Sequence, residues 1–453
     1  MVGGIKGLII VPDGIKYDIF KDMLDKDKLP NIKEHIVDRL LVSADNAFSV
    51  NPSSTSEAMP ALMTGCFPCF PGSTYLRNMI PFDLLRKQNP SKGDCTKKRT
   101  IFGYDFFSVS IHNPWNDGAN DKHPDIYSLA MMNYLIGRWR GSNSAAALRY
   151  RHTLRYDPDF TGIWLPSFDR YGHNNSDHGL KRRYHQLDRF VGNCAEAQKD
   201  AGTYDSTTIS LVSDHSNARA KKVNPNELCF KAGLRPRIGR RMDDYDCWVF
   251  AYGYGVCQIY LQRPIRKLPV IDRLLEHPAV EHVIEKNPEG NIVHSKDSVS
   301  VIRKEGDNYC MEVLAGKNPF GYPDDLVEKL SKPHSARKSL ELTYMQEQPN
   351  AVVGIAESLT HPDAPDMRLL ASPGYSFARV RNALHPLTMF NPITYRSHGT
   401  LHRDNSQIVF MIGGPPIVES KQVKYASIVD WMPTQLALMG ITLEDRVDGI
   451  SLV

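Results

Sequence analysis

The chain has 453 residues, of which 41% are hydrophobic and 23% charged, so it can bury a sizeable core and is neither a disordered chain nor a coiled-coil rod. This length allows up to three domains, or one large α/β sheet that carries an insertion. The 55 Lys and Arg against 51 Asp and Glu give a net charge of +4, which is too small to indicate a nucleic-acid partner, and no nucleic-acid-binding motif is present.

The N-terminal segment and the cysteines bear on localisation. The apolar run from Leu8 to Val11 is too short for the core of a signal peptide, and no stretch reaches the roughly 18 apolar residues of a membrane span. The eight cysteines are scattered, and Cys66 and Cys69 have no second pair at zinc-finger spacing. We therefore expect mostly free thiols and a cytoplasmic protein without a membrane segment, although a processed exported chain would have the same sequence.

Apolar runs and turn residues predict the elements of the first half of the chain. In chain order these are a buried strand over 7–11, helices over 19–24 and 32–40, a strand over 41–50, a turn over 51–55, a helix over 56–64, a strand over 161–165, a helix over 180–200 and a strand over 207–212. Alternating strands and helices, with polar residues where the strands end, are typical of a doubly wound, mostly parallel α/β sheet.

The pattern changes after residue 216. Alternating strands over 248–261 and hairpin-like runs over 292–313 stand in a Pro-, Gly- and Lys-rich segment. Strands over 367–371 and 408–412 and a helix over 428–439 then resume the α/β pattern. We interpret residues 217–350 as an inserted α+β lid, and residues 1–216 and 351–453 as a metal-binding catalytic α/β core.

Residues whose side-chain oxygen or imidazole nitrogen can bind a metal ion lie at the predicted strand ends and sharp turns: Asp13, Thr55, Asp169, His173, Asp214, His215 and His398. Aspartate and histidine suit Zn²⁺, which binds carboxylate oxygen and imidazole nitrogen. Taken singly, each has a structural explanation as a turn, cap or loop residue. Asp169 and His173 are more specific, because Gly172 between them lets both side chains bend toward one point.

In this order along the chain, these residues resemble the alkaline phosphatase superfamily, and within it the type I phosphodiesterase/nucleotide pyrophosphatase family. The resemblance covers both ends of the chain and most of the predicted core. The motifs that carry it are PDG at 12–14, LPN at 29–31, SSTSEAMPALMTG at 53–65, DRYGH at 169–173, SDHS at 213–216 and SHGT at 397–400, with softer matches in SPGYSF at 372–377 and IVDWMPTQLALMG at 428–440.

The resemblance implies two divalent metal ions, Zn²⁺ with Mn²⁺ or Fe as alternatives. One ion would be bound by Asp169, His173 and His398, and the other by Asp13, Asp214 and His215. Thr55 would be the nucleophile and would also contact the second ion. General chemistry agrees, because a threonine hydroxyl is a poor nucleophile until a cation stabilises its alkoxide, and a helix that starts at this residue offers free N–H groups to a phosphoryl oxygen.

Around the predicted nucleophile the chain also departs from the family pattern. Family members place an asparagine after the nucleophile helix to bind the phosphoryl group, and Asn78 is the nearest candidate for this catalytic, substrate-binding role. Residues 70–72 read Phe-Pro-Gly where a His-Gly pair is usual, and Glu57 replaces a common proline. These changes leave the metal ligands intact and affect the substrate pocket.

The function that we predict is hydrolysis of a small-molecule phosphate ester or phosphonate, as a phosphodiesterase/nucleotide pyrophosphatase that forms a phosphothreonine. A phosphomonoesterase, a phosphonate hydrolase and an inactive metal-binding relative remain as alternatives. Residues 55–59 lack the Cys or Ser, Pro and Arg of sulfatases, and Thr55 argues against the cofactor-independent mutases. A monoester would favour a further cation, for which Arg170 is a candidate.

The predicted lid carries residues that suit a nucleotide. Aromatic side chains can stack on a base and arginines can meet a phosphate. The candidates are Trp248, Tyr252, Tyr254, Arg235, Arg237, Arg240 and Arg241. A purely structural or oligomer-forming flap is the alternative for this segment, and the sequence does not indicate an oligomeric state.

Overall fold

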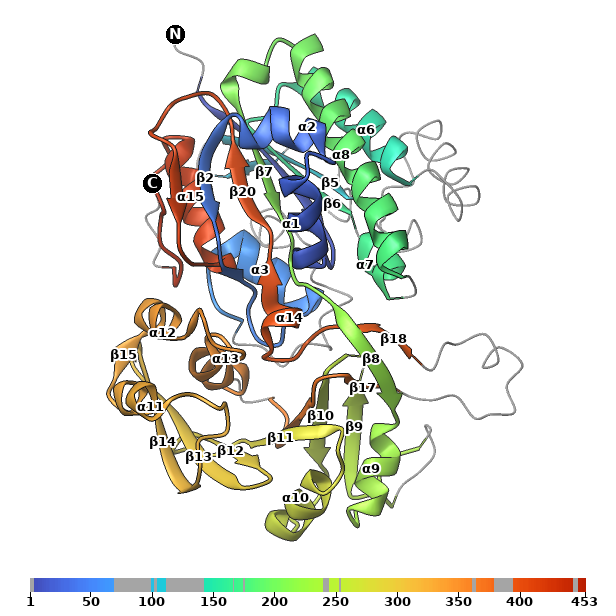
Figure 1. Ribbon diagram of the computed structural model, residues 1–453, viewed down its shortest axis with the longest axis vertical. Coiled ribbons are helices and arrows are strands. Elements are labelled where there is room, and N and C mark those ends of the chain that lie inside the picture. The colour runs from blue at the N-terminus through green and yellow to red at the C-terminus, as the bar shows by residue number, and fades with distance from the viewer. Residues whose placement is uncertain are drawn as a thin grey trace, which may run out of the picture.

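The computed structural model describes residues 4–68, 99–101, 104–110, 142–165, 167–173, 176–238, 244–251, 254–360, 364–378, 394–442 and 447–453. Figure 1 shows two lobes, each built around a large sheet: a core lobe at the top and a second lobe below it. The expected α/β fold class is confirmed by this arrangement of mixed parallel and antiparallel sheets.

The sheet of the core lobe has the strand order β21-β2-β20-β7-β1-β6-β5-β4. The strands β7, β1, β6 and β5 at its centre pair in parallel, whereas β20 runs antiparallel to both of its neighbours. Every residue of β6 and β7 is buried, which explains why they read as short continuous apolar runs. The bounds are β1 Lys6–Pro12, β2 Leu40–Ala44, β4 Arg99–Ile101, β5 Tyr104–Ser110, β6 Phe160–Leu165, β7 Thr207–Val212, β20 Phe410–Gly413 and β21 Lys421–Val423.

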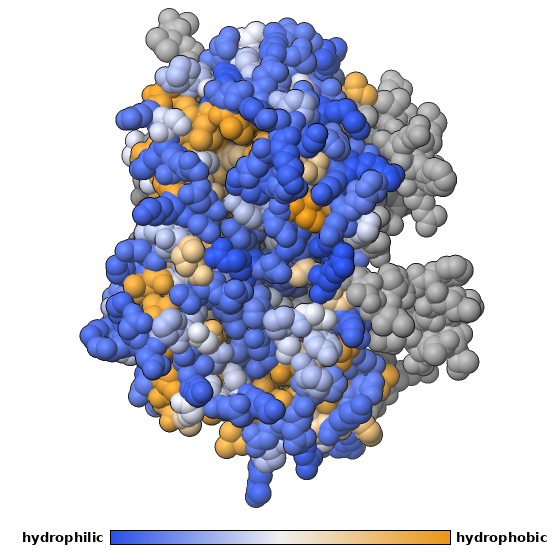
Figure 2. All heavy atoms as spheres, viewed as in Figure 1, coloured by the Kyte–Doolittle hydropathy of each residue, from blue (hydrophilic) through white to orange (hydrophobic). Residues whose placement is uncertain are grey.

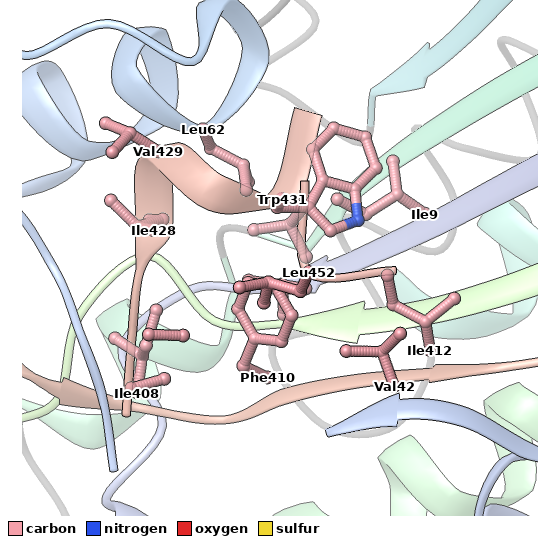
Figure 3. Close-up of a cluster of buried hydrophobic side chains, with 14 of the residues drawn as sticks. Ile9, Val42, Leu62, Ile408, Phe410, Ile412, Ile428, Val429, Trp431 and Leu452 are labelled. Carbon is pink, nitrogen blue, oxygen red and sulfur yellow. The ribbon is translucent and has the colours of Figure 1, made fainter. Parts of the chain in front are cut away.

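Helices cover both faces of this sheet, as expected of a doubly wound fold. One face packs against α1 (Tyr17–Asp25), α2 (Pro30–Ile32), α6 (Ser142–Thr153) and α8 (Asp177–Asp200), and the other against α3 (Thr55–Thr64) and α15 (Trp431–Leu438). Figure 3 shows the second of these interfaces, where Leu62 and Trp431 pack over Phe410. The helix predicted over 32–40 is shorter than expected, because a π-helical turn over Lys33–Val37 ends it and β2 begins at Leu40.

The second lobe contains an antiparallel sheet with the order β15-β14-β13-β12-β11-β16-β10-β9. Helices α9 and α10 pack on one face of it, and α11 and α13 on the other. The strands are β9 Cys247–Ala251, β10 Val256–Leu261, β11 Val280–Glu285, β12 Asn291–Ser295, β13 Ser298–Glu305, β14 Asn308–Gly316, β15 His334–Ser335 and β16 Met367–Ala371; the helices are α9 Pro225–Lys231, α10 Lys267–Leu275, α11 Asp324–Leu330, α12 Ala336–Thr343 and α13 Ala351–Ser358.

One predicted strand lies in the other lobe. We expected Met367–Ala371 to belong to the core, but as β16 it pairs antiparallel with β10 and β11 in the second sheet. A short apolar run reads alike in either sheet, so its partners could not be inferred from the sequence. The second sheet therefore extends beyond residue 350, while the division of the chain at residues 216 and 351 stays a prediction.

Short strands and turns link the two lobes. In Figure 1 the strand β8 (Ala218–Val223) runs from the core lobe to the second lobe, and it pairs with β17 (Tyr375–Phe377) and β18 (Thr394–Ser397). A further small sheet joins β3 (Ala47–Phe48), β19 (Gln407–Ile408) and β22 (Ala426–Ser427). The remaining helical segments are η4 Leu154–Tyr156, α7 Ser167–Gly172, η5 Tyr204–Ser206, α14 Arg403–Ser406 and η7 Ile428–Asp430.

The face seen in Figure 2 is mainly hydrophilic, with small separate apolar patches. Within the described ranges, no helix combines the length and the apolar character that crossing a bilayer requires. Six cysteines are described, and all carry free thiols, as expected: Cys66, Cys194, Cys229, Cys247, Cys257 and Cys310.

Candidate active site and metal centre

The site begins where β1 ends. Asp13 follows this strand and is 3% exposed, and its Oδ2 accepts a hydrogen bond from Trp164 Nε1 at 3.1 Å. Gly14 has φ +68°, and a Cβ at this position would stand 3.0 Å from Asp169 Oδ1 and 3.2 Å from His215 Cε1. The turn after β1 therefore requires glycine, both for its backbone conformation and for the close approach of the neighbouring side chains.

Thr55 is the first residue of α3 and points toward Asp13. Its Oγ1 donates to Asp13 Oδ1 at 3.2 Å and lies 3.1 Å from His215 Nε2. Ser54 precedes the helix in an extended conformation, so Thr55 stands at the end of α3 where the first N–H groups have no carbonyl partner within the helix. The hydroxyl is thus held between an aspartate and a histidine at a positively polarised helix end.

A second group forms around Asp169 on α7. His173 Nε2 lies 3.0 Å from Asp169 Oδ2, as the spacing of four residues predicted. His398, which directly follows β18, places its Nε2 3.6 Å from Asp169 Oδ1. The Nδ1 of His173 contacts the carbonyl of Arg396 at 2.5 Å, and the Nδ1 of His398 contacts the carbonyl of Ser53 at 3.0 Å, so both rings direct Nε2 toward the carboxylate.

Asp214 and His215 join the two groups from the end of β7. His215 Nε2 lies 3.3 Å from Asp13 Oδ1 and 3.5 Å from Asp214 Oδ2. Its ring stacks on that of His398 with 3.7 Å between the centroids. The Oδ1 of Asp214 accepts hydrogen bonds from the backbone N–H groups of Gly14 and His215, which fixes the carboxylate and leaves Oδ2 facing the site.

The donor atoms suit divalent cations. Two sets have ligand atoms within 4.8 Å of one another: Asp169 with His173 and His398, and Asp13 with Asp169 and His215. Buried Asp169 Oδ1, Asp214 Oδ2 and His398 Nε2 have no hydrogen-bond partner among the described residues. Since buried polar atoms are normally paired, and these carboxylate and imidazole atoms are ligands that Zn²⁺ prefers, the side chains fit metal ions.

The charges in the site strongly perturb one another. Burial, and then the charge of Asp214, raise the pKa of Asp13 well above its usual value. Burial also lowers the pKa of His215, but the charge of Asp214 and the hydrogen bond to Asp13 outweigh this effect and raise it to about 10. Burial and the neighbouring charge of His215 hold the pKa of His398 far below its usual range. Positive charge is therefore favoured between the carboxylates and disfavoured on His398.

Comparison with known proteins identifies the family. The sequence profile named "type I phosphodiesterase / nucleotide pyrophosphatase" matches residues 107–399, well over half of the chain. The chain belongs to this family. No curated protein matches it significantly in sequence.

Two solved structures of one murine protein have the same fold as this chain. Murine ectonucleotide pyrophosphatase/phosphodiesterase 5 is similar at 11% identity with a TM-score of 0.55, and the match covers 98% of this chain and 97% of that one. An inactive threonine-to-alanine variant of the same murine protein, in complex with AMP, is similar at 12% identity with a TM-score of 0.56 and the same coverage. At this identity the likeness shows the alkaline-phosphatase-like fold alone.

The structure brings all seven ligand-bearing residues of the sequence motifs to one place, and it adds supporting residues that sequence reasoning missed. Trp164 donates to Asp13, and Asn217 donates from Nδ2 to the carbonyl of Gly14. The carbonyls of Ser53 and Arg396 orient the two histidines of the Asp169 group. Trp164 is the second-last residue of β6, and a side chain with an N–H donor near the end of a strand was the available signal. Contacts made by backbone carbonyls leave no signal in the residue types.

The remaining predicted residues have different outcomes. Asn78, residues 70–72, Tyr252, Arg240, Arg241 and the side chain of Arg170 lie outside the described residues. Arg235 pairs with Asp244 and Asp246, and Arg237 lies over the rings of Tyr245 and Trp248. These two arginines are thus engaged within the second lobe, whereas the ring of Tyr254 contacts His398 at 4.4 Å between centroids.

Proposed function

We propose that this protein is a two-metal phosphodiesterase/nucleotide pyrophosphatase that acts through a covalent phosphothreonine at Thr55. Family membership supports a phosphodiester hydrolase. The observation that carries the finer proposal is the position of the Thr55 hydroxyl, 3.2 Å from Asp13 Oδ1 and 3.1 Å from His215 Nε2 at the start of α3. A threonine placed only as a helix cap would not need to point into a cluster of buried acids and imidazoles.

We assign Asp169, His173 and His398 to one cation, and Asp13, Asp214 and His215 with Thr55 to the other. Zn²⁺ is the expected ion, with Mn²⁺ or Fe as alternatives. The second set of close ligand atoms contains Asp169 instead of Asp214, but the unpaired Oδ2 of Asp214 lies 3.5 Å from His215 Nε2. When bound, such ions act as Lewis acids that polarise the phosphoryl group and lower the pKa of hydroxyl groups.

The residues of the chain would then carry out two displacements. Thr55 Oγ1 forms a bond to phosphorus, the ester bond to the leaving alcohol breaks, and the proton of Thr55 passes by way of the site to the departing oxygen. Asp13 Oδ1 already accepts this proton in a hydrogen bond, which leaves a lone pair of Oγ1 for the attack. Water then displaces Thr55 from phosphorus, and the threonine regains a proton.

The substrate that we propose is a small phosphate ester, and a nucleotide fits this class. The murine structure in complex with AMP belongs to a protein of the same fold and supports a nucleotide among the ligands to test. A phosphomonoesterase or phosphonate hydrolase would use the same centre, and cleavage of p-nitrophenyl phosphate, its bis ester and p-nitrophenyl phenylphosphonate in parallel would separate these activities. Of these, we expect the bis ester to be cleaved with the highest kcat/KM.

The test of the nucleophile is Thr55→Ala. We expect kcat for bis(p-nitrophenyl) phosphate to fall by at least about 10³-fold, because the covalent route is lost while binding groups remain. Thr64→Ala is the matched control, since Thr64 lies on the same helix and, among the described residues, its hydroxyl bonds to the carbonyl of Pro60 at 2.8 Å and the N–H of Cys66 at 3.1 Å. The control should keep nearly full activity.

Metal content and thermal melting of both variants would show whether the fold and the metal centre survive. Near-normal turnover by Thr55→Ala with intact metal content would contradict the covalent route and would indicate direct attack by water. Rapid quenching of the wild-type enzyme, followed by mass spectrometry of the peptide that contains Thr55, should show the mass of the phosphoryl adduct.

A further inference from the structure

A small pocket lies beside the predicted nucleophile, between α3 and the sheet of the second lobe. Its lining includes Ser54, Ser56, Glu57, Phe250, Tyr254 and Gln258. The cavity volume is about 20 Å³, which is room for one water-sized group such as a hydroxyl or an ammonium.

The pocket adjoins the reacting centre. Ser54 and Ser56 flank Thr55 in the chain, and Gly399, which also lines the pocket, follows His398. The ring of Tyr254 lies 4.4 Å from that of His398. When a phosphoryl group lies at Thr55, one of its ester substituents could therefore reach this pocket.

The polar groups that the start of α3 contributes to the pocket act as acceptors toward a ligand. Glu57 is 4% exposed and accepts hydrogen bonds from the hydroxyls of both Ser54 and Ser56. The two serines thus direct their protons to the carboxylate and keep only lone pairs for a ligand. Gln258 Oε1 already accepts from the hydroxyl of Tyr260 at 3.1 Å. A group that enters the pocket meets a carboxylate already bound by two neutral hydroxyls.

Arg368 provides the opposite charge behind this pocket. It stands directly across from Gln258 in the pairing of β16 with β10, so both side chains leave the same face of the sheet. The side chain is fully buried, and its three nitrogens have no hydrogen-bond partner among the described residues. Burial lowers its pKa only to about 10, so the guanidinium is charged at neutral pH.

We propose that this pocket receives the terminal group of the ester's organic substituent and that Glu57 selects substituents that end in a hydrogen-bond donor, either a hydroxyl or an ammonium. The inference rests on the proposed function and specifies its substrate class. An alkyl substituent would displace water from the buried carboxylate and offer no hydrogen bond in return, which is unfavourable. A substituent with a negative charge would be repelled by Glu57.

Three diesters test the selection: the 3-hydroxypropyl, 3-aminopropyl and butyl esters of p-nitrophenyl phosphate. They have the same leaving group and the same length, so differences in kcat/KM report the substituent. We expect the wild-type enzyme to prefer the hydroxyl or the ammonium ester over the butyl ester by about ten- to hundredfold, the range of one hydrogen bond to a charged group. A preference for the ammonium ester alone would assign the site to cationic groups.

Two variants assign the selection to Glu57. Glu57→Gln keeps an acceptor but removes the charge, so it should abolish the preference for the ammonium ester, and Glu57→Ala should abolish both preferences. Glu357→Gln is the matched control, because Glu357 is also 4% exposed and accepts from Lys304 and Tyr309 within the second lobe. It should keep the wild-type order of the three substrates.

The outcomes separate this inference from the proposed function. Equal kcat/KM for all three esters in the wild-type enzyme, which needs no variant to fold, would overturn the inference alone. A preference that persists in Glu57→Ala would also overturn it. Failure of the metal-loaded enzyme to cleave any of the three esters would overturn the proposed function, and with it this inference.

Discussion

Asp13 and Asp214 are buried carboxylates that share one small site. They are 3% and 0% exposed, and the charge of Asp214 raises the pKa of Asp13. Like charges in a site of low polarity oppose folding unless positive charge lies between them. Two divalent cations would offset this repulsion, so the metal ions proposed for catalysis should also stabilise the folded chain.

This coupling predicts the effect of metal removal. Protein purified without chelator should contain close to two divalent ions per chain by elemental analysis, and chelation should lower the melting temperature by several degrees, with recovery on addition of Zn²⁺. His398→Ala should lose about one ion, because His398 belongs to only one ligand set. The exposed His185 of α8 gives the control His185→Ala, which should keep both. A metal content near zero in the wild-type protein would contradict the prediction.

At the scale of single residues, the sequence predicted the ligand-bearing side chains because their types and strand-end positions are unusual together. The sequence could not predict which of these side chains contact one another. Asp169 takes part in both sets of close ligand atoms, and the stacking of His215 on His398 depends on loops that are distant in the chain. Contacts made by backbone carbonyls, such as that of Ser53 with His398, are independent of residue type and remain invisible in a single sequence.

The two ends of helix α3 have different roles: the first carries the predicted nucleophile, and the second packs against α15. Its first residue is Thr55, and it ends before Gly65, which has φ +69° and donates its N–H to the carbonyl of Ala61 at 2.9 Å. A Cβ on Gly65 would meet Met432 Cε at 3.2 Å and Pro433 Cδ at 3.3 Å. Gly65, the C-cap residue of α3, thus also lets α3 pack closely on α15.

Gly65→Ala should therefore lower the free energy of unfolding by about 1–2 kcal/mol for the left-handed backbone, with a further loss from crowding against α15. Gly202→Ala is the matched control, because Gly202 has the same φ of +69° after α8 and its Cβ would meet nothing within 4 Å. Denaturant unfolding of both variants separates backbone strain from crowding. Equal losses in the two variants would show that the contact with α15 does not matter. Turnover should change little, since Thr55 is at the opposite end of α3.

Helices and strands could be predicted from the sequence where the local pattern of apolar and turn residues determines them. The strand β7 was predicted with its observed bounds, and α8 begins three residues before its predicted start. The pairing of β16 was not predictable, because an apolar strand carries no mark of which sheet it joins. Arg368, the second residue of β16, was the one unusual feature of this apolar strand. Its surroundings could not be inferred from the sequence, because Glu57 and Gln258 belong to other elements.

The two lobes of the molecule are held together by polar contacts near the site. Glu281 of β11 contacts His402 Nε2 at 2.7 Å, and His402 follows β18 and the proposed metal ligand His398. Arg337 of α12 donates to Asp430 Oδ2 of the core lobe at 3.1 Å. Such contacts join segments more than 90 residues apart in the chain, so only the folded structure shows that the two lobes are linked through these side chains.

The contact between Glu281 and His402 predicts a pH-dependent stability. Burial raises the pKa of Glu281, but the hydrogen bond with His402 and the charge of His282 outweigh this effect, and the pKa falls below the usual 4.5. A carboxyl group with a lowered pKa contributes its full stabilisation at any pH above the pKa that it has in the unfolded chain. It loses that contribution as the pH falls through the lower pKa of the folded state.

Glu281→Gln should therefore lower the melting temperature by a few degrees at about pH 7, and the difference from wild type should shrink toward about pH 4. Glu328→Gln serves as the control, because the side chain of Glu328 is 77% exposed and forms an ion pair with Lys332 on the surface. This variant should melt like wild type at both pH values. A difference between Glu281→Gln and wild type that stays constant over this range would show that the charge of Glu281 does not hold the lobes together.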